Sequence, residues 1–214
     1  MKHIIHLTAM AALALVGASA APGPLQDKTL VAWVYLAHTN QQGGSALTVM
    51  EGEDFDAVVF GERQPGRWMA GSDFFRRTQG AEEQKPNPPE TASSNTLVQM
   101  AITYAGNRIS IYRDGQLYAS YAAAQTRRFG SNTTVLLGLR YLGEIGEIGF
   151  FTGAIEEARI YDTALSADRI AALAPNQASQ PQPLAWWTFE EGEAGDAMKN
   201  FPATRLEGHA RVAD

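Results

Sequence analysis

The chain contains no cysteine and only four histidines, and these two shortages exclude several kinds of site. Without cysteine there is no disulfide bond, no thiolate metal ligand and no lipid-anchored cysteine. Two of the histidines lie within the first six residues, which leaves His38 and His209 for the remainder of the chain. A histidine-based catalytic triad or a multi-histidine metal centre is therefore not expected. The G-x-S-x-G elbow, the phosphate-binding P-loop and the H-E-x-x-H zinc motif are missing as well.

Positive charge is also scarce. The 214 residues include 17 Lys and Arg against 23 Asp and Glu, which gives a net charge of −6. The densest basic stretches are two pairs, Arg76-Arg77 and Arg127-Arg128. Neither nucleic acid nor an anionic membrane surface is therefore an expected partner. Hydrophobic residues make up 45% of the chain, which is enough for one packed globular domain.

The N-terminus has the pattern of a signal peptide. An apolar run from Leu7 to Val16 follows a short basic start and is too short to span a bilayer. Ala18 and Ala20 then provide the small residues that a signal peptidase reads. We expect residues 1–20 to be cleaved off and the mature protein to be exported, periplasmic or extracellular, with no membrane span. The alternative is an N-terminal core helix, which the prolines that follow at once would isolate.

The clearest strand signals form two consecutive hairpins in the middle of the chain. Thr96 to Tyr104 alternates apolar and polar residues, and Gly106-Asn107 follows as a turn. Arg108 to Arg113 alternates in the same way and is joined to Gln116–Tyr121 by the two-residue turn Asp114-Gly115. A period of two interrupted by an Asp-Gly turn predicts paired antiparallel strands.

Further strand-like segments on both sides of these hairpins bring the total to nine or ten short strands. Strands do not alternate with helices, and no repeat of propeller or solenoid length is present. We therefore predict an all-β fold, an antiparallel β-sandwich. We interpret the glycine repeat from Gly143 to Gly149 as a series of turns. The other predicted strands are Leu30–Leu36, Ala46–Met50, Phe55–Gly61, Trp68–Ala70, Thr133–Leu139 and Phe151–Tyr161.

The most specific segment lies late in the chain, from Phe151 to Leu173, and reads FTGAIEEARIYDTALSADRIAAL. A strand with alternating parity ends at Asp162. Ser166 is a good N-cap for one short helix, and Pro175 ends that helix. The segment thus predicts a strand, a tight corner and a helix in succession.

This segment resembles the closing signature of LamG-like, concanavalin A-like jelly-roll domains. In that family a strand of the form F-x-G-x-I-[DE]-[DE]-x-R-[IV]-Y runs into a helix of the form A-L-S-x-[DE]-x-I, and every position matches here. The I-Y-R-D-G run ending at Gly115 is a second hallmark. The resemblance implies an antiparallel jelly-roll sandwich with one short helix. It also raises the expectation of a bound calcium ion, for which no ligands can be named because no D-x-D-x-D loop is present.

The domain organisation leaves one question open. We expect a jelly-roll domain over residues 27–174 and a polar linker over residues 175–183. Residues 184–214 contain the L-x-x-W-x-F-[DE] pattern with which family members usually begin. These C-terminal strands either complete the same sandwich or open a truncated second module. We favour completion, because Trp186, Trp187 and Phe189 need burial and no second core is present.

The stretch from Glu62 to Arg77 is the best candidate for ligand binding. Trp68 offers a flat apolar face for a sugar ring, and charged side chains around it offer hydrogen bonds to hydroxyl groups. The alternative is that Trp68 fills the core and that the arginines only promote solubility. The predicted carbohydrate-binding residues are Trp68, Asp73, Arg76, Arg77, Glu62 and Arg67.

Catalysis is not expected. Glu156 and Glu157 are adjacent on one predicted strand, so they point to opposite faces and cannot form the facing pair of a glycosidase. Asp27 to Thr78 and Thr96 to Met100 resemble the jelly-roll module that precedes β-fructosidase and levanase-type glycoside hydrolases, but the W-M-N-D-P-N-G motif of those enzymes is missing. We expect a non-catalytic carbohydrate-binding module that acts either alone or as an accessory to a glycoside hydrolase. The alternatives are the front of a fructan-degrading hydrolase and a cell-surface module that binds protein.

Overall fold

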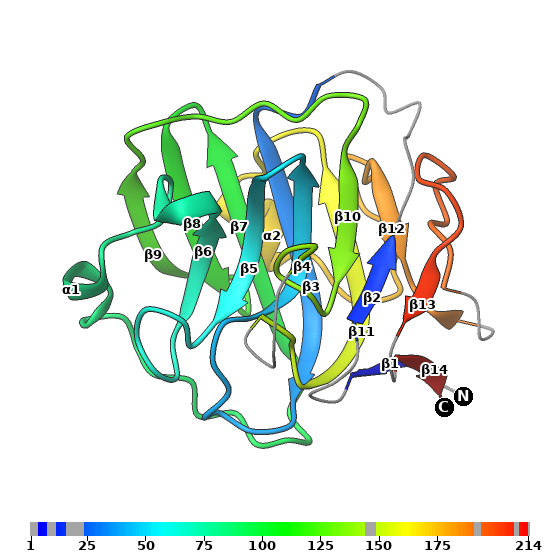
Figure 1. Ribbon diagram of the computed structural model, residues 1–214, viewed down its shortest axis with the longest axis horizontal. Helices are drawn as coiled ribbons and strands as arrows, with labels where there is room; N and C mark the ends of the chain where they lie inside the picture. The colour runs from blue at the N-terminus through cyan, green and yellow to red at the C-terminus, as the bar shows by residue number, and fades with distance from the viewer. Residues whose placement is uncertain are drawn as a thin grey trace.

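Two antiparallel β-sheets lie face to face in the computed structural model (Figure 1). The structure describes residues 4–7, 12–15, 24–143, 149–190, 194–207 and 210–213. The predicted all-β jelly-roll sandwich is confirmed. No helix in these described residues is long and apolar enough to cross a membrane.

The larger sheet has eight strands in the order β14-β1-β11-β3-β7-β8-β9, with β12 paired to β11 beside this path. Its centre is the pair β11 and β3, and the two predicted hairpins form β7, β8 and β9. The strands are β1 (Ile4–Leu7), β3 (Lys28–Leu36), β7 (Val98–Ala105), β8 (Arg108–Arg113), β9 (Gln116–Ala122), β11 (Gly153–Tyr161), β12 (Ala185–Trp187) and β14 (Arg211–Ala213).

The smaller sheet has six strands in the order β13-β2-β10-β4-β5-β6. β4 and β5 form a hairpin, and β6 continues the meander to the sheet edge. The strands are β2 (Ala12–Leu15), β4 (Gly44–Glu51), β5 (Asp54–Phe60), β6 (Trp68–Ser72), β10 (Thr134–Leu137) and β13 (Arg205–Glu207).

The main core lies between the sheets and follows the alternation of the strands. Val98, Met100 and Ile102 of β7 face Val58 and Phe60 of β5 across this core. The intervening residues of β5 point outward, as period-two geometry requires. Each sheet therefore also has an outer face, and both outer faces carry apolar clusters of their own.

The alternation predicted for β11 is interrupted by a β-bulge. The pairing of β11 with β3 shifts register between Ile155 and Glu157. As a result, the side chains of Ile155, Ala158 and Ile160 all lie in the main core, although Ile155 is an odd-numbered position and the other two are even-numbered. The prediction of one uninterrupted alternation along this strand was wrong, because a bulge inserts one extra residue and reverses the alternation beyond it, so that Ala158 faces the core and Ala154 does not.

The predicted helix after β11 is α2 (Ala167–Ala171), and Ser166 caps it by accepting a hydrogen bond from the Arg169 backbone N–H. Ile170 packs it on Trp33 and Tyr161, on the outer face of the eight-stranded sheet. A second helix, α1 (Ala81–Gln84), and a 3-10 turn, η1 (Asp73–Phe75), follow β6.

The two ends of the chain lie at the same side of the sandwich. β1 pairs with β11 and β14, and β2 pairs with β10 and β13. Both N-terminal strands fall within residues 1–20, the expected signal peptide. The expected cleavage site after Ala20 lies outside the described residues, and so do residues 144–148 of the glycine-rich turns.

The C-terminal segment joins the same core as the central strands. β12 pairs with β11 beyond β1, and Trp187 packs beside Phe201 with ring centroids 5.8 Å apart. Asp196 fixes the following turn, because its carboxylate accepts hydrogen bonds from the backbone N–H groups of Trp186, Met198, Asn200 and Phe201.

The long polar excursion between β6 and β7 is fastened by one buried carboxylate. Glu90 accepts hydrogen bonds from the indole of Trp68 at 2.9 Å and from the guanidinium of Arg113 at 2.9 and 3.0 Å. It also accepts the backbone N–H groups of Thr91 and Ala92. Burial works to raise the pKa of Glu90, but the hydrogen bonds from Arg113, Trp68 and Ala92 outweigh it, so that its pKa is lowered.

Candidate ligand-binding site

A hollow of about 320 Å³ opens on the outer face of the six-stranded sheet. Its floor comes from the outward residues of β5, of which Phe55 lines the hollow. Tyr141, from the segment after β10, packs against Phe55 with ring centroids 6.0 Å apart. The sheet thus supplies a rigid aromatic base. The lining residues are Glu53, Phe55, Glu62, Ser72, Asp73, Phe74, Phe75, Arg140 and Tyr141.

Two exposed phenylalanines form the wall of the hollow where β6 ends. Phe74 is 77% exposed and Phe75 is 38% exposed. Both have left-handed backbone conformations, with φ of 46° and 57°. Residues other than glycine rarely adopt this conformation, and each instance costs free energy. An exposed aromatic side chain on a strained backbone is a costly arrangement, which makes this wall a candidate for function.

Arginines cover part of the two phenylalanine rings. The guanidinium of Arg76 lies 5.1 Å from the ring centroid of Phe74, and that of Arg63 lies 4.4 Å from the ring of Phe75. Cation–π contacts of this kind favour one ring orientation. The wall therefore combines apolar ring surface with hydrogen-bond donors at its rim.

Polar groups converge on the same hollow. Glu62 forms an ion pair with Arg140, and Asp73 is bound by Arg76 and Arg77. Glu53 stands exposed at the rim. Carboxylate oxygens accept hydrogen bonds and guanidinium groups donate them, so the hollow presents both to a ligand with hydroxyl groups.

The prediction that Trp68 offers an open ring face was wrong. Trp68 is 0% exposed, lies in the main core and packs on Phe60 with ring centroids 4.8 Å apart. The reason is its position on β6, where Trp68 and Ala70 share the inward parity. The alternative interpretation of Trp68, that it fills the core, is the one that the structure supports.

Arg67 is also placed away from the hollow. Its guanidinium donates to the backbone carbonyls of Asn87, Lys85 and Pro65, which ties the long excursion to β6. The structure thus brings Glu62 and Asp73 into the hollow, sets Arg76 at its rim and separates Trp68 and Arg67 from it.

Arg77 lies beneath the hollow in a buried network of charges. Its guanidinium donates to Asp56, to Asp73 and to the backbone carbonyl of Phe55. Asp56 in turn pairs at 2.8 Å with Lys28, which extends from β3 of the opposite sheet. Burial opposes the charged form of Arg77, but Asp56 and Asp73 outweigh it, and its pKa is raised.

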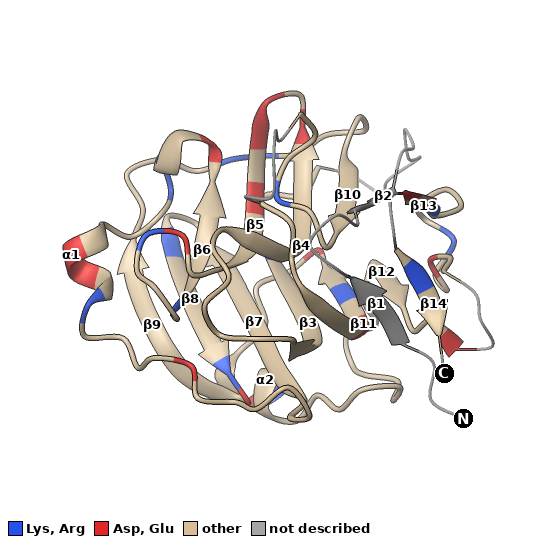
Figure 2. Cartoon of the chain, turned by 60° about the horizontal axis from the view of Figure 1, so that its bottom comes forward, with Lys and Arg blue, Asp and Glu red and all other residues tan. Residues whose placement is uncertain are grey.

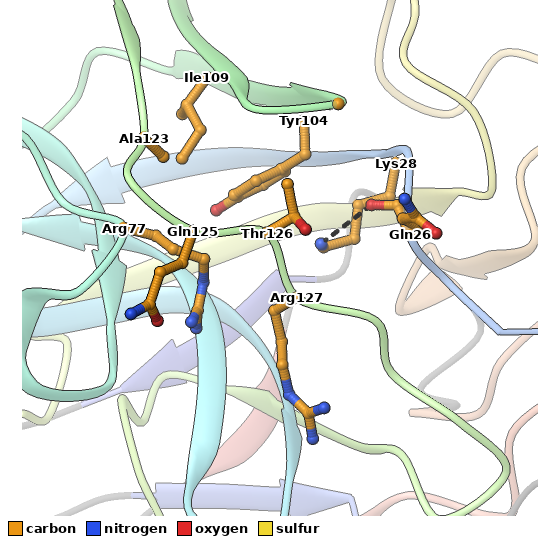
Figure 3. Close-up of a pocket in the computed structure, with 10 residues that line it drawn as sticks. Gln26, Lys28, Arg77, Tyr104, Ile109, Ala123, Gln125, Thr126 and Arg127 are labelled. Carbon is orange, nitrogen blue, oxygen red and sulfur yellow. Dashed lines mark hydrogen bonds between the residues drawn. The ribbon is translucent and has the colours of Figure 1, made fainter.

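Lys28 and Arg77 of this network border a small cavity of about 10 Å³, which is about the size of one water molecule (Figure 3). Lys28 lies over the ring of Tyr104 at 4.1 Å, and burial lowers the pKa of Lys28. The hydroxyl group of Tyr104 has no hydrogen-bond partner among the described residues. This cavity is too small for a ligand of sugar size.

Sequence reasoning missed most of the aromatic lining. Phe74 and Phe75 lie inside the predicted stretch, but nothing in the pattern distinguishes them from core residues. Only their position could have indicated exposure: the two aromatic residues come after the predicted strand, behind Ser72-Asp73, and directly before two arginines. Arg140 and Tyr141 come from a distant segment, and only the fold brings them to the hollow.

The described part of the chain shows no ligand set for the calcium ion that the family resemblance implies. Among the residues that the structure describes, no group of three or more His, Asp or Glu side chains is placed to hold a metal. Glu51 and Asp54, on the two sides of the β4–β5 turn, are engaged by Arg127. Charged residues lie on strands as well as on loops, and acidic residues lie on α1 (Figure 2).

Comparison with known proteins places the fold. The sequence model of the concanavalin A-like lectin/glucanase superfamily matches residues 14–171. No protein of curated function matches the chain in sequence.

Solved structures of similar fold come from several organisms. A heptameric SAP-like pentraxin from Limulus polyphemus has a TM-score of 0.67 at 12% identity, over 99% of this chain and 94% of its own. A Bacteroides ovatus protein, named as a suspected carbohydrate-binding protein, also has 0.67 at 13% identity, over 100% of this chain and 60% of its own. Domain 4 of AbnA, a GH43 extracellular arabinanase from Geobacillus stearothermophilus solved with arabinotriose, has 0.55 at 15% identity, over 78% of this chain and 74% of its own.

Proposed function

Because the chain belongs to the concanavalin A-like lectin/glucanase superfamily, we propose that it is an exported, non-catalytic module that binds carbohydrate. We assign the binding site to the hollow on the outer face of the six-stranded sheet. The observation that carries this proposal is the exposed, strained pair Phe74–Phe75 beside converging carboxylate and guanidinium groups. A sugar ring has an apolar C–H face and a rim of hydroxyl groups, and this hollow offers a partner for each.

The fold relatives support the same assignment at the level of ligand class. One is named for suspected carbohydrate binding and another was solved with arabinotriose. We propose a neutral oligosaccharide as the ligand and a role beside a glycoside hydrolase. At the sequence identities of these relatives only the fold is common, so the site itself rests on the residues of this chain.

The ion pairs of the acidic residues in the hollow support binding without catalysis. Glycoside hydrolysis needs two facing carboxyl groups, one of them able to give up a proton. Here Glu62 is bound to Arg140, and Asp73 is bound to Arg76 and Arg77. No histidine is among the lining residues. We expect Glu53 and Glu62 to accept hydrogen bonds from a bound sugar, because both keep exposed surface, whereas Asp73 is buried beneath Arg76 and Arg77.

A glycan array with the purified protein, followed by calorimetric titration with arabinotriose, tests the function. We expect Phe74→Ala to weaken binding by at least about tenfold, as loss of a central aromatic contact does, with the fold intact. The matched control is Leu117→Ala, which removes another largely exposed apolar side chain, from β9 of the other sheet.

Two results would contradict the proposal. The first is an array without signal at high protein concentration, with and without calcium, which favours the protein-binding alternative. The second is unchanged sugar affinity in Phe74→Ala, which removes the hollow as the site. A catalytic domain encoded downstream in the same open reading frame would instead support the alternative that this chain is the front of a fructan-degrading hydrolase.

A further inference from the structure

One buried ion pair closes the chain around the exposed wall of the hollow. The ion pair joins Asp73, directly before Phe74, to Arg77, four positions further along the chain. The guanidinium Nη2 of Arg77 lies 2.5 Å from Oδ1 of Asp73, and both side chains are buried. The backbone N–H of Arg77 also donates to the hydroxyl group of Ser72, which fastens the same turn at its base.

The turn between these two anchors needs such a hold. Phe74 and Phe75 are successive residues in the left-handed region, where L side chains are strained. Phe74 is largely exposed, so burial of its ring does not compensate the strain. Without an external constraint the turn would relax to a conformation in which the two rings are no longer presented together.

The Asp73–Arg77 ion pair is held in place by contacts of Arg77 to both sheets. Arg77 Nε donates to Asp56 of β5 at 2.8 Å, and Asp56 pairs with Lys28 of β3. The backbone carbonyl of Arg77 accepts the hydroxyl group of Tyr121 of β9 at 2.9 Å. Figure 3 shows the side chains of Arg77 and Lys28 on different elements beside the small cavity. Neither end of the turn can move without breaking a contact to the body of the sandwich.

We propose that Arg77 is a positioning residue of the ligand site. With Asp73 it forms a clamp that holds Phe74 and Phe75 in their strained conformation and so presents both rings before a ligand arrives. The inference rests on the proposed function in that the rings form the binding wall. A preformed wall costs the ligand little ordering free energy, which is why a protein would retain the strain.

A double-mutant cycle without any ligand tests the clamp. Urea unfolding is measured for wild type, Arg77→Lys, Phe74→Gly and the double variant. Lysine keeps the charge but cannot donate to Asp56, Asp73 and the Phe55 carbonyl together. Glycine removes the left-handed strain, so Phe74→Gly alone should raise the midpoint. Lys199→Gly is the matched control for Phe74→Gly. Lys199 is also exposed and has a φ of 60°, but it lies in the C-terminal segment, so its substitution should not be coupled to Arg77→Lys.

We expect the two changes to be coupled. Arg77→Lys should destabilise the Phe74→Gly background more than the wild type, by about fivefold or more in the folding equilibrium constant, because only in the wild type does the released turn also lose the strain of Phe74. Additive effects, or a lower midpoint for Phe74→Gly than for wild type, would overturn the proposal. If Arg77→Lys does not fold, Asp73→Asn replaces it in the cycle, since it removes the other half of the clamp.

Arabinotriose titration supplies the functional readout. Arg77→Lys should weaken binding by about tenfold while remaining folded, although its side chain does not line the hollow. Unchanged affinity in that variant would overturn the positioning role. Absence of binding by the wild-type protein would contradict the proposed function instead, and the urea cycle would still decide whether the clamp exists.

Discussion

At the residue scale, the structure assigns several conspicuous side chains to support rather than to recognition. Trp68 is the main example, because its indole is buried and donates to Glu90. Composition and local pattern alone do not separate these roles, since a tryptophan next to arginines suits a sugar site and a sheet edge equally well. The parity of β6 decides between them, because Trp68 and Ala70 share the face that points into the core.

Glu90 gives a prediction about pH. Its pKa is lowered in the folded protein, so its contribution to stability is present above the unfolded value of about 4.3 and is lost as pH falls through the folded value. We expect Glu90→Gln to lower the free energy of unfolding at pH 7 by about 1–3 kcal/mol, because Arg113 and Trp68 lose a shared charged acceptor. Urea unfolding at a series of pH values measures this difference.

The difference between wild type and Glu90→Gln should shrink below about pH 4 as wild-type Glu90 becomes protonated. Glu82→Gln on the exposed helix α1 is the control and should leave stability unchanged. A difference that stays constant over the whole pH range would show that the charge of Glu90 is not what holds the excursion.

At the element scale, the central strand β11 contains the charged residues Glu157 and Arg159, and their contacts give the reason. Arg159 lies between the rings of Trp33 and Trp186, at 5.0 and 4.7 Å from their centroids. It pairs with Glu157 and donates to the backbone carbonyls of Ala174 and Gln177. The expected linker of residues 175–183 is thus fastened to β11.

Removing this arginine should loosen three elements together. We expect Arg159→Met to lower the free energy of unfolding by about 3–5 kcal/mol, because Glu157 is left as an unpaired buried charge. Tryptophan fluorescence should also change, since two indoles border the guanidinium. Arg169→Met on the exposed face of α2 is the control, and an equal loss of stability in both variants would contradict this account.

Most strands were predictable because their signals are local. The β7–β8–β9 hairpins follow from alternation and two turns, and α2 follows from its Ser166 cap. The bulge at Ile155 was not predictable, because no residue there breaks the strand pattern and only the pairing with β3 reveals the extra residue. The hollow was half predictable: Glu62 and Asp73 are near each other in sequence, whereas Tyr141 and Arg140 arrive through the topology.

At the scale of the whole molecule, the N-terminal strands and the expected signal peptide make opposing demands. β13 pairs only with β2, and β14 pairs only with β1, among the described strand pairs. If export removes residues 1–20, both C-terminal strands lose their partners. The contacts of Gly153 to Ile155 with β1 are lost as well.

We expect the exported protein to begin at Ala21, as intact mass measurement would reveal. In hydrogen exchange, amides of residues 205–207, 211–213 and 153–155 should then exchange faster in the mature chain than in a full-length chain that retains its N-terminus. Residues 158–160 are the internal control, since β12 still protects them. An exported protein with the mass of the full chain would contradict the cleavage.

The hollow and helix α2 occupy opposite outer faces of the sandwich. Ala172, at the exposed end of α2, therefore lies far from any sugar bound beside Phe74. Since the chain has no native thiol, Ala172→Cys would give a single attachment point for a dye or a sensor surface. A layer coupled in this way would hold every molecule with its recognition face turned toward the solution.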